Sequence, residues 1–314
     1  MELKKLTKAE YIEKINGFVD LFQVCFNKEI PENFLKWRYI ENPVDDFFVY
    51  VAMDNNKIIA NYSVSPIILS SKDGDIKSAL SMTTMTHPSY SGRGLFTKLA
   101  SLLYEDMQRL GYKLVWGFPN SNSHRAFVTK LEWRDIYEIP TMRINLKNRT
   151  QLHKTTSIEI NQDNEFDLNY GINNYNDLIR VKKDNLYLKW RYFSNPLNNY
   201  KNIVITDNGD VSSFLIFKYF GENEIDIVDF SFKTFEEGEC LLRQIIICSQ
   251  DEEIDYINSW APRHSVNHTL FEKFGFMNHM PITYFGKRDL LYLNERISSD
   301  FSNWFIQMGD SDVF

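Results

Sequence analysis

A six-residue segment, Ser91-Gly-Arg-Gly-Leu-Phe96, combines the residue types that can hold a phosphate. Glycines let a loop approach a ligand closely, and the first N–H groups of a helix have no partners inside the helix. Because these groups and the positive end of the helix dipole attract anions, a pyrophosphate fits this segment, with a plain turn as the alternative until the surrounding elements are considered. Arg93 and Lys98 add positive charge on the same side.

The elements on either side of this loop are those that an anion site requires. Residues 79–86, rich in Thr and Met, predict a strand. Leucines at helical spacing predict a helix over residues 95–110, which Gly111 stops in a left-handed conformation. A second short strand is expected at residues 113–116, and a further helix over residues 120–131.

This order of elements, with its Gly-x-Gly loop, resembles the GNAT superfamily of acyl-CoA N-acyltransferases over residues 1 to about 145. In that family an Arg/Gln-x-x-Gly-x-Gly/Ala segment wraps the CoA pyrophosphate. Its counterpart here consists of Ser91, Gly92, Arg93, Gly94, Leu95 and Phe96. Gly94 matches the pattern, whereas Ser91 replaces the Arg/Gln and Phe96 replaces the last small residue. The resemblance implies acetyl-CoA, or another acyl-CoA, as co-substrate, and no metal.

The same resemblance implies where the rest of the coenzyme binds. The backbone of Met85 and Thr86 would pair with the pantetheine arm, and a splay between this strand and residues 113–116 would admit the thioester. GNAT enzymes often take a proton donor from a Tyr on the following helix, but that position is Val128. Residues 79–86 also contain no Glu, where a general base is common in the family.

Three polar residues near the start of the predicted helix are candidates for the missing roles. Histidine exchanges protons near neutral pH, so His124 is the candidate proton relay, with a surface histidine at a helix start as the alternative. Asn120 and Asn122 are candidates to orient CoA or the acceptor; alternatively, they are turn and cap residues.

An internal repeat organises the chain. The run Leu35-Lys-Trp-Arg-Tyr39 recurs, 153 residues later, as Leu188-Lys-Trp-Arg-Tyr192, and Asn-Pro follows at the same distance in both copies. We interpret this motif as a short helix, ended by Asn-Pro, with an architectural role. The repeat is domain-sized and predicts two domains, residues 1–148 and 149–314.

The second copy resembles a degenerate GNAT domain, because its segment Asp229–Cys240 lacks a Gly-x-Gly loop and carries acids instead. The pair is similar to tandem-GNAT proteins, and residues 117–122 resemble bacterial members associated with surface-polysaccharide enzymes. The expected fold class is α/β (α+β), each domain a mixed, mostly antiparallel sheet flanked by helices. A polar linker is expected at 147–174, and a final helix within residues 298–314.

Composition and charge exclude several other classes of protein. The formal net charge is −7 and the 35 Lys and Arg residues are scattered, so no nucleic-acid partner is expected. Three cysteines without a CxxC spacing, and a pair of histidines (His264 and His268) without a third ligand, give no metal site. The sequence has no run long and apolar enough to span a membrane and no signal-like N-terminus, so we expect a cytoplasmic protein.

These observations predict an N-acyltransferase that moves an acetyl or other short acyl group from CoA to a small-molecule amine by direct attack on the thioester. An amino sugar or glycan precursor as acceptor is implied by resemblance alone. Two alternatives stay open: a non-catalytic acyl-CoA sensor or scaffold, and a Fem-like aminoacyl transferase that uses tRNA. The oligomeric state also stays open.

Overall fold

The computed structural model describes residues 1–147, 149–152, 165–168, 177–293 and 298–314. The strands are β1 (Glu2–Lys5), β2 (Phe48–Asp54), β3 (Lys57–Ser71), β4 (Gly74–Thr86), β5 (Leu114–Gly117), β6 (Arg134–Asn145), β7 (Arg180–Val181), β8 (Lys201–Asp207), β9 (Asp210–Phe220), β10 (Glu224–Ser231), β11 (Tyr256–Ser259) and β12 (Met277–Asp289). The helices are α1 (Lys8–Glu13), α2 (Ile15–Phe26), α3 (Glu32–Tyr39), α4 (Leu95–Arg109), α5 (His124–Leu131), α6 (Asn185–Leu188), α7 (Phe235–Asp251) and α8 (Val266–Lys273).

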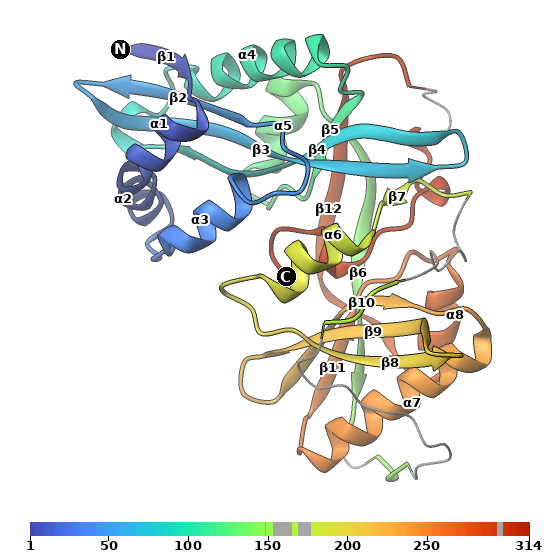
Figure 1. The fold of residues 1–314 in the computed structure, drawn as a ribbon. Coiled ribbons are helices and arrows are strands. Elements are labelled where there is room, and N and C mark those ends of the chain that lie inside the picture. Colours follow the sequence, from blue (N-terminus) through green and yellow to red (C-terminus); the bar gives the residue numbers. More distant parts are fainter. Residues whose placement is uncertain (148, 153–164, 169–176, 294–297) are drawn as a thin grey trace.

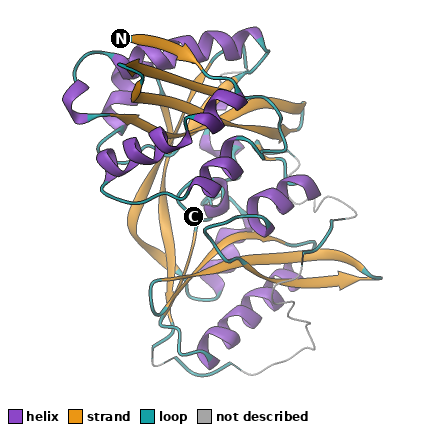
Figure 2. Cartoon of the chain, turned by 60° about the vertical axis from the view of Figure 1, so that its left-hand side comes forward, coloured by secondary structure: helices purple, strands orange, loops and turns teal. Residues whose placement is uncertain are grey.

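All twelve strands belong to one sheet that runs through the whole molecule (Figures 1 and 2). Its order is β1-β2-β3-β4-β5-β12-β6-β11-β10-β9-β8, and β7 pairs with the end of β3. Most neighbouring strands are antiparallel, and the pairs β4–β5 and β10–β11 are parallel. Helices flank the sheet, which confirms the predicted fold class of a mixed, mostly antiparallel sheet with helices on its faces.

From β2 and from β8 onward, the two halves of the chain repeat the same order of elements, but each half completes its sheet with a strand of the other. We call residues 1–147 the first half and the chain from residue 149 the second half. The last strand of the first half, β6, pairs with β11, and the last strand of the second half, β12, pairs with β5. Strands β6 and β12 also pair with each other, so both run between the two halves in Figure 1.

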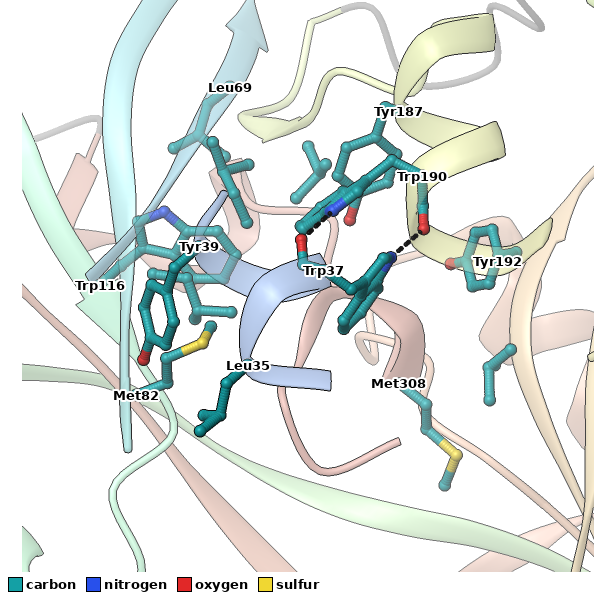
Figure 3. Packing of buried hydrophobic residues seen from close by; sticks show 14 of the residues in the cluster. Leu35, Trp37, Tyr39, Leu69, Met82, Trp116, Tyr187, Trp190, Tyr192 and Met308 are labelled. Atoms are coloured by element: carbon teal, nitrogen blue, oxygen red, sulfur yellow. Dashed lines mark hydrogen bonds between the residues drawn. The ribbon is translucent and has the colours of Figure 1, made fainter. Parts of the chain in front are cut away.

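The repeated Trp-Arg-Tyr motifs meet at the centre of the molecule (Figure 3). Trp37 Nε1 donates to the backbone oxygen of Trp190 at 2.7 Å, and Trp190 Nε1 donates to that of Trp37 at 2.9 Å. The two indoles stack with their centroids 5.1 Å apart and an angle of 21° between the rings. Each buried indole N–H thus has a partner, and the motif has the packing role that the sequence indicated.

Alternation along the strands divides the hydrophobic interior into layers. On β2, Val49 packs in the same cluster as α2, whereas Phe48 packs on the opposite face with α4. On β9 of the second half, Leu215 packs with α7, and Phe214 joins the cluster that contains Val49. This shared cluster also holds both tryptophans of the motif, so it joins the two halves.

The predicted final helix is wrong. The tail forms two single 3₁₀ turns, Phe301–Asn303 and Met308–Asp310, with extended chain between them. Residues 304–311 are all buried, so this stretch has no solvent face and its side chains pack in several directions. Most of the predicted linker at 147–174, and residue 148 at the proposed domain boundary, lie outside the described residues. Within the described chain, no helix is long and apolar enough to cross a membrane.

Candidate functional site

The glycine loop connects β4 to α4 in the way that its residues predict. After β4 ends at Thr86, a 3₁₀ turn spans Pro88–Tyr90. Gly92 and Gly94 then adopt positive φ angles of 77° and 72°, which side chains other than glycine rarely tolerate. Helix α4 begins directly after Gly94, which caps it without any side-chain hydrogen bond.

This loop presents a set of unused backbone donors. No residue in the described part of the chain accepts a hydrogen bond from the N–H groups of residues 92–97. The first turn of α4 contains no acidic side chain, and Lys98 is exposed one turn into the helix. Since the dipole of α4 also favours negative charge here, the geometry fits the pyrophosphate of a coenzyme.

The side chains around the loop stabilise its conformation and do not occupy its backbone N–H groups. The Arg93 guanidinium lies over the ring of Tyr90, 4.7 Å from its centroid, and donates to the Ser89 backbone oxygen. The Tyr90 hydroxyl donates to Asp54 at 2.8 Å, which raises the pKa of the phenol. Phe96 packs against Phe127 of α5, with ring centroids 5.3 Å apart, and so places α5 beside the loop.

Strands β4 and β5 separate next to this loop, as the sequence predicted. Their last paired residues are Leu80 and Trp116, whereas on its other edge β5 stays paired with β12 through Gly117. Gly117 stands at the point of separation, where an added Cβ atom would lie 3.0 Å from the backbone oxygen of Ser81. Only glycine therefore fits here without displacing β4.

Beyond the separation, β4 carries a bulge that changes the direction of its edge. The register with β3 shifts between the pairs Ser63–Met82 and Asn61–Met85, and Thr83 has a φ of 51°. The hydroxyl of Thr84 in this stretch is buried and has no hydrogen-bond partner in the described chain. A buried polar atom left without a partner is costly, so this hydroxyl has the capacity for a further hydrogen bond.

The two residues assigned to the pantetheine arm lie at the end of the same strand. Met85 is buried opposite Asn61, and Thr86 pairs with Ala60 of β3. The thiol of Cys25, at the end of α2, donates to the Thr86 backbone oxygen with 3.4 Å between the two atoms. The structure thus brings Met85 and Thr86 to the edge of the separation, and α2 closes it on one face.

A buried network of hydroxyl groups, which the sequence analysis missed, lies next to the separation of β4 and β5. Tyr62 OH lies 2.6 Å from Tyr104 OH and 3.2 Å from Ser81 Oγ, and Trp133 Nε1 donates to Tyr104 OH. Burial raises the pKa of Tyr104 to about 12, so this phenol stays neutral and serves as a structural hydrogen-bonding group. Isolated aromatic residues on three elements gave no sequence signal for such a network.

The polar candidates around the start of α5 have different environments. The Asn120 side-chain oxygen accepts from the backbone N–H groups of Asn122 and Ser123, so Asn120 forms the turn that precedes α5. The side chain of Asn122 is exposed. His124 Nε2 lies 2.8 Å from Asp135 Oδ1, and its ring stacks on Tyr284 with centroids 3.9 Å apart. Neither Asp135 nor Tyr284 was expected at the site.

The corresponding region of the second half is closed. The Thr234 side chain caps α7 by accepting from the Glu237 N–H, and Glu236 and Glu237 stand in its first turn. Capped amides and acidic side chains disfavour a phosphate. On the edge of β10, Phe230 N donates to Gln307 Oε1 at 2.8 Å, and Asn267 Nδ2 donates to the Phe230 oxygen at 2.9 Å.

The two histidines at i, i+4 spacing, His264 and His268, contact backbone oxygens of the second half. His264 lies 3.0 Å from the Trp304 backbone oxygen and His268 lies 3.2 Å from that of Ala261. Across the described part of the chain, no three His, Cys, Asp or Glu residues are grouped closely enough to hold a metal ion.

Comparisons with known proteins agree with this geometry. Residues 4–135 match the family model of the acetyltransferase (GNAT) domain. No curated protein matches the sequence. Among solved structures, a GCN5-related N-acetyltransferase from Anabaena variabilis is similar with a TM-score of 0.70 at 11% identity, over 95% of this chain and 75% of that one.

Two further structures share the fold over nearly the whole chain. A probable N-acyltransferase from Enterococcus faecalis has a TM-score of 0.66 at 11% identity, over 92% of this chain and 72% of that one. Saccharomyces cerevisiae N-myristoyltransferase with bound myristoyl-CoA has a TM-score of 0.60 at 11% identity, over 91% of this chain and 82% of that one.

Proposed function

We propose that this chain, whose residues 4–135 match the model of the GNAT acetyltransferase domain, transfers a short acyl group from CoA to an amine at the first-half site. The observation that carries the proposal is the row of unused N–H donors at residues 92–97, next to the point where β4 and β5 separate. The donors hold the pyrophosphate, and the separation admits the pantetheine arm along Met85 and Thr86.

The proposed reaction is a direct attack without a covalent enzyme intermediate. The neutral amine nitrogen of the acceptor attacks the thioester carbonyl carbon, a C–N bond forms, and the C–S bond to CoA breaks. The Thr84 hydroxyl, which has no hydrogen-bond partner in the described chain, donates to the carbonyl oxygen as negative charge develops. His124 takes the proton that the nitrogen loses and returns it to the departing thiolate.

The second half is proposed to bind no coenzyme. The side chains of Gln307 and Asn267 occupy the backbone groups of Phe230 on the edge of β10. Phe230 and Thr84 hold comparable positions in their strands. Ser231, which follows Phe230, pairs with Phe214 of β9, and Met85, which follows Thr84, pairs with Asn61 of β3. The edge that takes pantetheine in the first half is thus already occupied in the second, and we expect one CoA per chain.

The acceptor is proposed to be a small primary amine, with amino sugars and glycan precursors as the first candidates. This choice follows the resemblance of residues 117–122 to the corresponding segment of bacterial polysaccharide-associated relatives. We also propose that the protein acts in the cytoplasm, where acyl-CoA is available.

The experiment combines calorimetry with an assay for free thiol. The protein should bind one equivalent of CoA, and acetyl-CoA mixed with a panel of amines, amino sugars included, should release thiol in step with N-acetylated product. Binding without turnover across the panel would instead support the sensor alternative. Absence of heat with millimolar CoA would refute the coenzyme site itself.

A further inference from the structure

His124 is held by one residue from each of the two strands that the halves exchange. Asp135 lies at the start of β6, and its Oδ1 is 2.8 Å from His124 Nε2. Tyr284 lies on β12, and its ring is nearly parallel to the imidazole, with an angle of 6° between them and centroids 3.9 Å apart. The histidine itself is the first residue of α5.

These contacts determine which ring nitrogen carries the proton. A carboxylate only accepts hydrogen bonds, so the neutral imidazole carries its proton on Nε2 and donates it to Asp135. No residue in the described ranges of the chain hydrogen-bonds to Nδ1 of His124, which is therefore left as a proton acceptor. The stacked Tyr284 ring restricts rotation of the imidazole about its side-chain bonds.

His124 is the first residue of α5, the helix that packs against the coenzyme loop. His124 and Val128 are four residues apart on the helix, so they share the face on which the family's proton donor stands. Phe127, on the same helix, contacts Phe96 of the coenzyme loop. A histidine one turn away can thus take the role for which Val128 has no suitable group.

We propose that Asp135 and Tyr284 are positioning residues that keep His124 ready to accept the proton of the attacking amine, so that the second half completes the first-half active site. The inference rests on the proposed function. In the step that it concerns, the C–N bond forms, the nitrogen loses its proton to His124 Nδ1, the C–S bond breaks, and the same proton passes to the thiolate sulfur.

The decisive variant is Asp135→Asn, because an amide can keep the hydrogen bond while reversing its direction. The amide NH₂ donates to Nε2, which moves the imidazole proton to Nδ1 and removes the acceptor. We expect kcat to fall about 10- to 100-fold, with KM for acetyl-CoA changed less than about twofold. In ¹⁵N–¹H spectra of the imidazoles, assigned with His124→Gln, the proton signal should move from Nε2 to Nδ1.

Two substitutions test the stacked ring. Tyr284→Phe keeps the ring and should retain kcat within about twofold, whereas Tyr284→Ala removes it and should lower kcat about tenfold. The matched controls are Tyr292→Ala, at a tyrosine that is 87% exposed, and Asp73→Asn in the exposed β3–β4 hairpin; both should behave as the wild type.

The possible outcomes separate this inference from the proposed function. If the wild type binds CoA and turns over but Asp135→Asn matches it in kcat and in its imidazole spectrum, the positioning role is refuted and the acyltransferase assignment stands. If Tyr284→Phe and Tyr284→Ala lose activity equally, the role of the stacked ring is refuted. If the wild type binds no CoA, the proposed function fails and this inference fails with it.

Discussion

The N-termini of α4 and α7 begin corresponding helices in the two halves, and their surroundings differ in every respect that matters for an anion. At α4 the chain enters through Gly94 with its amides unused and no acid in the first turn. At α7 it enters through Thr234, whose side chain occupies an amide, and two glutamates follow. The same succession of strand, helix and strand thus gives an open row of amides or a capped helix start, depending on a few residues.

The edges of β4 and β10 differ in the same sense. Both strands are bulged and both separate from a parallel neighbour. In the second half, side-chain amides from α8 and from the tail fill the separation, whereas the first half leaves the Thr84 hydroxyl without a partner in the described chain. The comparison teaches that two halves with the same strand and helix order can differ at the strand edge, which is occupied by side chains in one half and leaves a hydroxyl without a partner in the described chain in the other.

The largest expected effect is on stability, and it tests the tryptophan motif that the two halves share. Trp37→Ala and Trp190→Ala each remove a fully buried indole from the central stack and leave the partner's backbone oxygen without its donor. Each should lower the free energy of unfolding by about 3–5 kcal/mol, measured by urea denaturation. The double variant should lose less than the sum, because the two residues share one contact. A large loss in only one of the variants would mean that the two motifs do not support each other.

The next largest effect is on CoA binding, and it tests the glycine loop that the first half has and the second half lacks. Gly94→Glu places a carboxylate and a strained backbone at the loop, and it should weaken CoA binding at least about 100-fold in calorimetry. Gly209→Glu is the matched control, since Gly209 has a φ of 90° and equally open space but lies in the second-half hairpin. Retained affinity in Gly94→Glu would remove the distinction between α4 and α7.

Among the histidines compared, turnover should depend on His124 of the first half and not on His279 of the second. His124→Ala is expected to lower kcat about 100-fold at unchanged CoA affinity, because the amine then has no positioned proton acceptor. His279→Ala, at an exposed histidine on β12, serves as the control and should leave kcat unchanged. Equal rates in both variants would exclude His124 as the relay.

The smallest expected effect is on kcat/KM, and it tests the difference between the edges of β4 and β10. Thr84→Val keeps the shape of the side chain but removes the hydroxyl, and it should lower kcat/KM about 2- to 10-fold if one hydrogen bond to the thioester is lost. Ser249→Ala removes a buried hydroxyl from α7 in the second half, which likewise has no hydrogen-bond partner in the described chain, and it should not affect catalysis. A thiol-release assay at subsaturating acetyl-CoA measures both.

Local sequence was sufficient for the elements around the coenzyme loop. Gly92, Gly94 and Gly111 adopt positive φ angles, and α4 runs from Leu95 to Arg109 between them, because caps and helical periodicity depend on neighbouring residues only. The separation of β4 and β5 was likewise predicted, through resemblance. The roles of individual site residues stay predictions, and Asn120 adopts a turn conformation that the sequence had given as one of two alternatives.

What the sequence by itself determined is the repeated motif, the glycine loop before α4 and the order of elements, since each is recorded in residues that are close together or repeat at one offset. The tertiary structure decided that β6 pairs with β11 of the second half and β12 with β5 of the first. It also decided that Asp135 and Tyr284 contact His124, and that residues 304–311 are buried without forming a helix. These outcomes depend on pairing and burial between residues far apart in the chain, where competing partners have the same local pattern and only the packing of the whole sheet distinguishes them.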